Sequence, residues 1–329
     1  MSKPTRATWF MTHRCNIACS YCATILPEQV TDELDLEGTL DIAEALAAIG
    51  PEIVILTGGE ALMHPHVQPV IDLFNRVGQE FVVITNATRP LTVTGIKNIS
   101  CSIDTTDVPH RARRADSGSD ELYKSSWGWE LLTTAADRGM VPTASIVAGR
   151  SNAYQVPALI EELAAQGITS MVGTLHQSPL QIGVHWRFRS QGDDATLLPE
   201  QAEWLSSALC ALKDRGVPIL NDRSYFVDMA RHGAALDWHC DTPSDLMVDS
   251  DGSIMTCQDW WGAECKALNV RDAVLGPLWQ RVRAIDQWCE DWTVAHRVDN
   301  AKCSGCFWNC THQAASDASS VSVGLRALR

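Results

Sequence analysis

The stretch ATWFMTHRCNIACSYC, residues 7–22, joins an apolar run to a loop that carries three cysteines. The apolar run has the composition of a buried β-strand, and the polar residues after it predict a loop. Cys15, Cys19 and Cys22 are separated by three and then by two residues. Tetrahedral metal sites and four-iron clusters usually take four protein ligands, so the motif is one ligand short.

Predicted strands and helices alternate along the first half of the chain. We expect strands at 7–12, 52–57, 80–85, 97–103, 141–149 and 168–175, and helices at 36–50, 66–78, 119–139 and 152–167. This alternation predicts a parallel sheet with helical crossovers. Six units are fewer than the eight of a closed barrel. We therefore predict an α/β fold, a partial (β/α)6 TIM-like barrel whose ligands bind at the carboxyl ends of the strands.

The alternation of predicted strands and helices stops after about residue 176. We predict a core domain at 1–176, a connecting helical segment at 177–235, and a small cysteine-rich α+β extension at 236–329. The connecting segment contains one clear amphipathic helix at 199–216. The extension opens with hairpin signals around the Asp-Gly pair at 251–252.

Composition narrows the class of protein. The 329 residues carry a formal net charge of −14, which argues against nucleic-acid binding because phosphates attract basic surfaces. The first ten residues do not have the pattern of a signal peptide, and no apolar run reaches the length of a membrane helix. We therefore expect a cytoplasmic protein that binds no membrane. Twelve cysteines in that reducing compartment indicate metal binding, catalysis or burial rather than disulfides.

Two simpler explanations of the three thiols, burial in the core and a zinc site, fit the sequence less well. Buried core cysteines would lie on an apolar face, whereas these alternate with polar residues such as Arg14 and Asn16. A zinc site would need a fourth ligand, and His13 is the only candidate nearby. Its position two residues before Cys15 matches no zinc-ligand pattern.

The motif resembles the signature of the radical S-adenosylmethionine (SAM) superfamily, CxxxCxxC with an aromatic residue before the last cysteine. Cys15, Cys19, Tyr21 and Cys22 match it. The resemblance implies a four-iron cluster held by three thiolates. The amino and carboxylate groups of SAM would occupy the open iron, so the missing ligand would be the cosubstrate.

Other motifs extend the resemblance. Gly58, Gly59 and Glu60 follow the second predicted strand and match the family's GGE, which holds the methionine amino group. Glycines permit close backbone approach, and a carboxylate can pair with an ammonium. Weaker matches, for which simple loop capping stays an alternative, imply cosubstrate contacts at Thr85, Asn86, Ser102, Asp104 and Asn152.

The second group of cysteines has its own pattern. Cys240 and Cys257 flank the predicted hairpin as C-x11-G-x4-C, and Cys303, Cys306 and Cys310 follow in CSGCFWNC. Spacing alone allows a structural zinc here. The pattern resembles the SPASM and Twitch extensions of radical SAM enzymes, and the short series favours the Twitch-like form with one auxiliary four-iron cluster. Five candidate thiolates compete for at most four places, so the ligand set stays open.

The resemblance implies a 5′-deoxyadenosyl radical that abstracts hydrogen from a substrate. The substrate we expect is a small polar metabolite (a sugar, an aminocyclitol or a nucleoside) in antibiotic biosynthesis. An auxiliary cluster that accepts an electron would make the reaction an oxidation. A thiol that returns hydrogen would make it an epimerisation, and Cys265 and Cys289 are the candidate donors. A reductant such as flavodoxin or ferredoxin would be a partner.

Two alternatives stay open. Radical SAM enzymes that modify ribosomal peptides usually carry a peptide-recognition domain, often N-terminal, and we expect none here because few residues precede the first strand. A non-catalytic iron–sulfur or zinc scaffold would need neither the GGE motif nor an open iron. Candidate substrate-wall residues, each equally suited to packing, are Trp127, Trp129, His176, His185, Trp186, Arg187, Arg189, Trp260 and Trp261.

Overall fold

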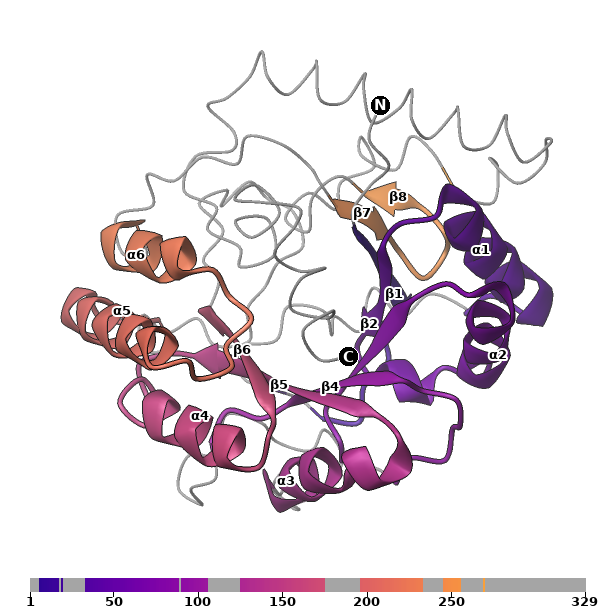
Figure 1. Ribbon diagram of the computed structural model, residues 1–329. Helices are drawn as coiled ribbons and strands as arrows, with labels where there is room; N and C mark the ends of the chain where they lie inside the picture. Colours follow the sequence, from indigo (N-terminus) through magenta and orange to yellow (C-terminus); the bar gives the residue numbers. More distant parts are fainter. Residues whose placement is uncertain are drawn as a thin grey trace, which may run out of the picture.

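The computed structural model describes residues 6–17, 19, 33–88, 90–105, 125–174, 196–232, 245–255 and 269. They form one sheet with the strand order β6-β5-β4-β3-β2-β1-β7-β8 (Figure 1). The strands are β1 Arg6–Thr12, β2 Ile53–Gly58, β3 Phe81–Thr85, β4 Asn98–Ser102, β5 Val141–Ala148, β6 Thr169–Thr174, β7 Asp245–Val248 and β8 Ile254–Met255. The helices are α1 Leu36–Ile49, α2 Val67–Val77, α3 Ser125–Thr134, α4 Val156–Ala165, α5 Pro199–Asp214 and α6 Arg223–His232, with 3-10 turns η2 Ala61–Met63 and η4 Ala136–Arg138.

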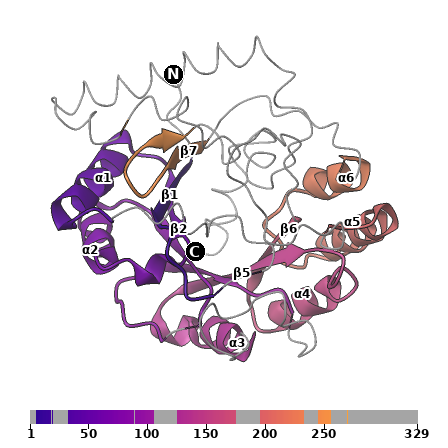
Figure 2. The same cartoon turned by 180° about the vertical axis from the view of Figure 1, so that it is seen from behind.

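The six predicted parallel strands are confirmed. β1 to β6 pair in sequence order, each parallel to the next. The sheet curves into an open arc, and α1 to α5 cover its outer face (Figures 1 and 2). This is the expected partial TIM-like barrel. In the part of the chain that the structure describes, none of the helices combines the length and the apolar run needed to cross a bilayer.

Local signals explain where the helices begin and end. Asp35 caps α1 by accepting a hydrogen bond from the Gly38 N–H at 2.9 Å, and Gly50 ends the helix with φ 66°. The helix expected over 119–139 is described only from residue 125 onward. Within the described residues it runs from Ser125 to Thr134, and the 3-10 turn η4 continues it. The sequence analysis did not identify α6.

Two apolar clusters hold the arc together. One lies under β1 to β3 and is built around fully buried side chains such as Trp9, Leu56 and Phe74. The other lies under β4 to β6 and includes Ile146 and Tyr225. Nearly every side chain in these clusters is less than a tenth exposed. Because buried side chains are closely packed, the clusters restrict the movement of the strands and of the residues at their ends.

The predicted hairpin around residues 251–252 is confirmed, and its place in the fold was not anticipated. β7 and β8 are antiparallel, with Val248 opposite Ile254 and Gly252 in the turn at φ 84°. β7 also pairs parallel with β1, so that Arg6 lies opposite Asp245. The start of the cysteine-rich extension therefore continues the sheet of the core. The domain boundaries at 176 and 236 stay predictions.

Candidate functional site

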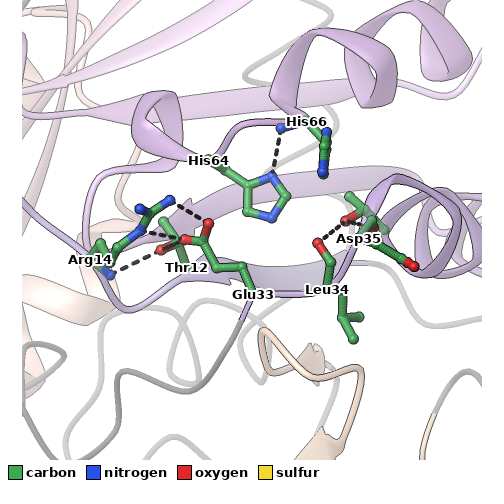
Figure 3. A network of polar contacts seen from close by, with 8 residues as sticks. Thr12, Arg14, Glu33, Leu34, Asp35, His64 and His66 are labelled. Atoms are coloured by element: carbon green, nitrogen blue, oxygen red, sulfur yellow. Dashed lines mark hydrogen bonds and ion pairs between the residues drawn. The ribbon is translucent and has the colours of Figure 1, made fainter.

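The segment that follows β1 is fixed by a partly exposed carboxylate, that of Glu33. Thr12 Oγ1 donates to Glu33 Oε1 at 2.5 Å, and the Arg14 guanidinium donates to both oxygens of the same carboxylate, with Nε at 2.7 Å from Oε1. The Arg14 N–H also donates to Thr12 Oγ1 at 3.0 Å. This network holds the chain in a defined path just before Cys15 (Figure 3).

The Gly58–Gly59–Glu60 loop packs directly against that path. Gly59 N donates to the Thr12 carbonyl at 2.7 Å, and Glu60 N donates to the Arg14 carbonyl at 2.8 Å. A Cβ added at Gly59 would lie 2.2 Å from the Arg14 carbonyl oxygen. Glycine is therefore required here by contact between two protein loops, besides any role in approaching a ligand.

The Glu60 side chain is buried and connects two strand ends. Its Oε1 accepts from Leu62 N at 3.2 Å, and its Oε2 accepts from Asn86 N at 2.7 Å, while only 3% of the residue is exposed. The ends of β2 and β3 are thus tied through one carboxylate. The residue expected to hold an ammonium group also organises the site around it.

Asn86 brings the end of β3 to the cysteine loop. Its Nδ2 lies 3.5 Å from Cys15 Sγ and 3.1 Å from Asn16 Oδ1, and it donates to both. Asn16 Nδ2 in turn donates to Thr88 Oγ1 at 2.6 Å. The Thr85–Asn86 turn, one of the weaker sequence matches, therefore brings a side chain into contact with a cysteine of the motif.

The ends of β4 and β5 are joined by Asn152, which is fully buried. Its Nδ2 donates to the carbonyls of Asp104 and Val147, each at 3.0 Å, and its Oδ1 accepts from Gly149 N at 2.8 Å. The Asp104 carboxylate accepts from Val147 N at 2.9 Å. Both amide hydrogens of Asn152 are used within the fold. The adenosine contact expected there, and the contacts expected at Ser102 and Asp104, stay predictions.

His13, the residue weighed as a zinc ligand, has another buried partner. Its Nε2 lies 2.6 Å from Asp249 Oδ1, and the two side chains are 3% and 5% exposed. Asp249 directly follows β7. The pair therefore joins the segment before Cys15 to the hairpin between Cys240 and Cys257.

A second histidine, His64, ends the 3-10 turn η2 that follows the GGE motif. His64 Nδ1 accepts from His66 N at 3.2 Å, and its ring lies between the Arg14–Glu33 pair and His66 (Figure 3). Burial lowers the pKa of His64 from 6.5 to about 4, against the opposing effect of Glu33 and with smaller contributions from His66 and Arg14. The imidazole is neutral at pH 7.

The described residues give one side of the expected metal centre. The thiol of Cys15 is half-buried and that of Cys19 is buried, while Cys22 and Tyr21 lie outside the described residues. Among the described residues no group of three metal-binding side chains is assembled. The thiols of Cys15 and Cys19, with an amide donor on Cys15 Sγ, fit two of the ligands of an iron–sulfur cluster.

Several predicted residues cannot be placed. All expected ligands of the auxiliary cluster and both candidate hydrogen donors lie outside the described residues: Cys240, Cys257, Cys303, Cys306, Cys310, Cys265 and Cys289. Of the wall candidates only Trp127 and Trp129 are described. Trp127 lines a cavity of about 490 Å³ between the segment after β3 and α3, together with Thr88 and Arg138. Trp129 packs against the second apolar cluster.

The sequence analysis missed four residues that build the site: Asn16, Glu33, Thr88 and Asp249. Asn16 stands inside the cysteine motif, and Thr88 stands two residues after Asn86, so their positions were a usable signal. Glu33 and Asp249 act across 19 and 236 residues of sequence and gave none.

Comparison with known proteins agrees with this geometry. Residues 9–125 match the family model described as the Radical SAM superfamily, a stretch that spans β1 to the start of α3. An AdoMet-dependent heme synthase of Methanosarcina barkeri is 27% identical over 154 residues, which are 42% of this chain and 44% of that protein. A GTP 3′,8-cyclase of Marinobacter nauticus is 29% identical over 165 residues, which are 46% and 48% of the two chains. The chain thus aligns with less than half of the length of these curated relatives.

Solved structures share the fold. The crystal structure of Streptococcus suis SuiB bound to S-adenosylmethionine has a TM-score of 0.62 at 12% identity, and covers 82% of this chain and 64% of that one. Native anSMEcpe with bound AdoMet has a TM-score of 0.61 at 13% identity, and covers 98% and 99% of the two chains. At these identities the likeness establishes the α/β architecture and not a substrate.

Proposed function

We propose that this chain is a radical SAM enzyme whose first cluster is held by Cys15, Cys19 and Cys22. The observation that carries the proposal is the convergence of three strand ends. The Cys15 loop after β1, Glu60 after β2 and Asn86 after β3 are joined by direct hydrogen bonds. A loop that only terminated a strand would not need this shared network.

Each described residue then has a specific task. The Glu60 carboxylate, beside the glycine loop, would accept the methionine ammonium of SAM. Ser102, Asp104 and Asn152 would border the ribose and adenosine side, with Asn152 fixing the Asp104 backbone. When bound, the cluster and SAM together supply a 5′-deoxyadenosyl radical for hydrogen abstraction. The protein's own contribution is to bind, orient and shield the reacting groups.

An auxiliary four-iron cluster in the extension is part of the proposal. It is supported by the hairpin of β7 and β8, which lies between Cys240 and Cys257 and is anchored on β1. Cys303, Cys306 and Cys310 would complete the ligand set, from which at least one of the five thiolates is left out. Flavodoxin or ferredoxin would supply the electron.

The preferred substrate is a small polar metabolite, with oxidation or epimerisation at one carbon. The net charge of −14 suits a cationic molecule such as an amino-sugar. In the epimerase form Cys265 or Cys289 would return the hydrogen atom. Peptide modification is the second candidate, because relatives include the antilisterial bacteriocin subtilosin biosynthesis protein AlbA of Bacillus subtilis and PqqA peptide cyclases of Xanthomonas oryzae.

Anaerobic reconstitution tests the proposal. We expect about eight irons per chain, as two four-iron clusters, and 5′-deoxyadenosine when dithionite and SAM are added. Cys15→Ala should abolish 5′-deoxyadenosine formation, while Cys210→Ala, a buried cysteine on α5, should leave it unchanged. Iron binding without SAM cleavage would overturn the proposed enzymatic function and favour a non-catalytic iron–sulfur scaffold. Trials with amino-sugars, nucleosides and a short peptide would then separate the two substrate classes.

A further inference from the structure

We propose that Asn86 sets the redox potential of the first cluster by donating a hydrogen bond to the Cys15 thiolate; this inference rests on the proposed function. Asn86 Nδ2 lies 3.5 Å from Cys15 Sγ, which is a usual length for an N–H···S hydrogen bond. Asn86 was expected from sequence to contact the cosubstrate. Its amide in the structure is directed at a cluster ligand.

A ring of side chains fixes which end of the amide faces the sulfur. Asn86 Oδ1 accepts from both Thr88 N at 3.0 Å and Thr88 Oγ1 at 2.5 Å. Thr88 Oγ1 accepts from Asn16 Nδ2, and Asn16 Oδ1 accepts from Asn86 Nδ2. A flipped Asn86 amide would place its NH₂ group against the Thr88 N–H. The network therefore selects the orientation that presents a donor to Cys15.

The backbone of Asn86 is held just as firmly. Its N–H donates to the buried Glu60 carboxylate at 2.7 Å, and only 7% of the residue is exposed. Ala87 follows with φ 54°, a left-handed conformation that is uncommon for a residue other than glycine. This turn places Asn86 and Thr88 on either side of it, within reach of Cys15 and Asn16. Contacts within the protein therefore hold the Asn86 donor in place.

The chemical consequence concerns the reduced cluster. Reduction adds one electron from the reductant to the cluster, and no bond to Asn86 is made or broken. A hydrogen bond to a ligand sulfur stabilises the more negative state, so it raises the reduction potential. In a site with few water molecules this effect is larger than in bulk solvent. Asn86 would thus make the first cluster easier to reduce.

The test is an EPR-monitored redox titration of the reconstituted full chain, using the reduced-cluster signal that changes when SAM is added. Asn86→Ala should lower the potential of that signal with iron content near the wild-type level. We expect about a tenfold fall in the ratio of reduced to oxidised cluster at a fixed potential, or 59 mV for a one-electron couple. Asn75→Ala on α2, whose Nδ2 donates to the Gly95 carbonyl, is the matched control and should not shift it.

Variants of Thr88 give a second test of the inference in the same redox titration. Thr88→Val removes the hydroxyl that fixes the amide and should shift the potential in the same direction by less, whereas Thr88→Ser should retain the wild-type value. An unchanged potential in Asn86→Ala would overturn the inference. Should that variant fail to hold iron, an unchanged potential in Thr88→Val would overturn it. A wild-type chain without any SAM-responsive signal would instead count against the proposed function.

Discussion

His13 Nε2 and Asp249 Oδ1 lie 2.6 Å apart, and both side chains are almost completely buried. The two residues are separated by 236 positions in sequence. His13 stands two residues before Cys15, and Asp249 stands at the turn of the β7–β8 hairpin. One hydrogen bond therefore couples the loop of the first cluster to the segment expected to carry the second.

Removing the carboxylate should loosen the hairpin. In Asp249→Ala the buried His13 ring loses its hydrogen bond to the carboxylate, and we expect the free energy of unfolding of the protein without clusters to fall by about 1–3 kcal/mol. Urea unfolding measures this change, and hydrogen exchange at 245–255 locates it. Asp72→Asn, on the exposed face of α2, is the control and should change stability by less than about 0.5 kcal/mol. Equal protection of the hairpin in Asp249→Ala and wild type would contradict the coupling.

Gly59→Ala should damage the cysteine loop. The new Cβ would lie 2.2 Å from the Arg14 carbonyl oxygen, so the two loops must separate. We expect a loss of about 1–3 kcal/mol in stability, typical of overpacking, and a clear fall in iron bound after reconstitution.

Gly78→Ala is the matched control. Gly78 has φ 75° with open space around its Cα, so alanine there costs about 1 kcal/mol of backbone strain and should leave iron binding unchanged. Full iron content in Gly59→Ala would show that the loops tolerate separation.

The buried His64 predicts a pH dependence. Its pKa is about 4 in the folded protein, against 6.5 when unfolded, so the unfolded chain binds the extra proton first. Stability due to this group is complete above pH 6.5, falls as pH drops towards 4, and levels off below that. The total loss is roughly 3 kcal/mol.

The variant His64→Asn isolates this contribution. Its side-chain oxygen can accept the hydrogen bond from His66 N that Nδ1 accepts now, but it does not titrate. Urea unfolding between pH 4 and 7 should show the variant losing less stability than wild type on acidification. If stability falls equally with pH in the two proteins, the pKa of His64 is not lowered by folding.

Asn152→Ala should destabilise the junction of β4 and β5. The change removes three hydrogen bonds between the Asn152 side chain and the backbone, and we expect a loss of about 2–4 kcal/mol. Asn98→Ala, which removes a single half-buried contact to the Phe81 carbonyl, should cost about 1 kcal/mol. Urea unfolding compares the two. Equal losses of stability in the two variants would contradict the structural role of Asn152. If folded Asn152→Ala also binds SAM more weakly, Asn152 has the expected adenosine contact besides its structural role.

The auxiliary cluster can be tested by metal content. Replacing Cys240 and Cys257 by alanine together should lower bound iron from about eight to about four per chain, because one four-iron cluster is lost. SAM cleavage should persist in the variant. Unchanged iron, or zinc released in place of iron, would exclude an auxiliary iron–sulfur cluster held by these two residues.

Much of the fold could be predicted because its signals are local. The strands are short apolar runs that end at polar residues or glycine, and helix α1 ends at Gly50 as expected. The rule that ligands collect at the carboxyl ends of parallel strands correctly placed Gly59 and Asn86 near Cys15. Residue type and strand position were sufficient for these inferences.

The features that could not be predicted depend on contacts between residues that are far apart in the sequence. β7 is only four residues long, and nothing in Asp245–Val248 indicates that its neighbour is β1. The bond between Asn16 and Thr88 spans 72 residues, and it depends on the turn at Ala87. The residues of such pairs come together only when the sheet has formed. A single sequence therefore identifies the chemical groups but not the hydrogen bonds that orient them.

The position of β1 between β2 and β7 bears on how the protein is made. Arg6 pairs with Asp245, about 240 residues later, so a ribosome adding roughly 5–20 residues per second delivers the second neighbour of β1 roughly 10–50 s after the first strand. During that interval one edge of a strand whose seven residues are all buried in the folded protein is open to other nascent chains. Expression at low temperature with added chaperones should therefore raise the soluble yield.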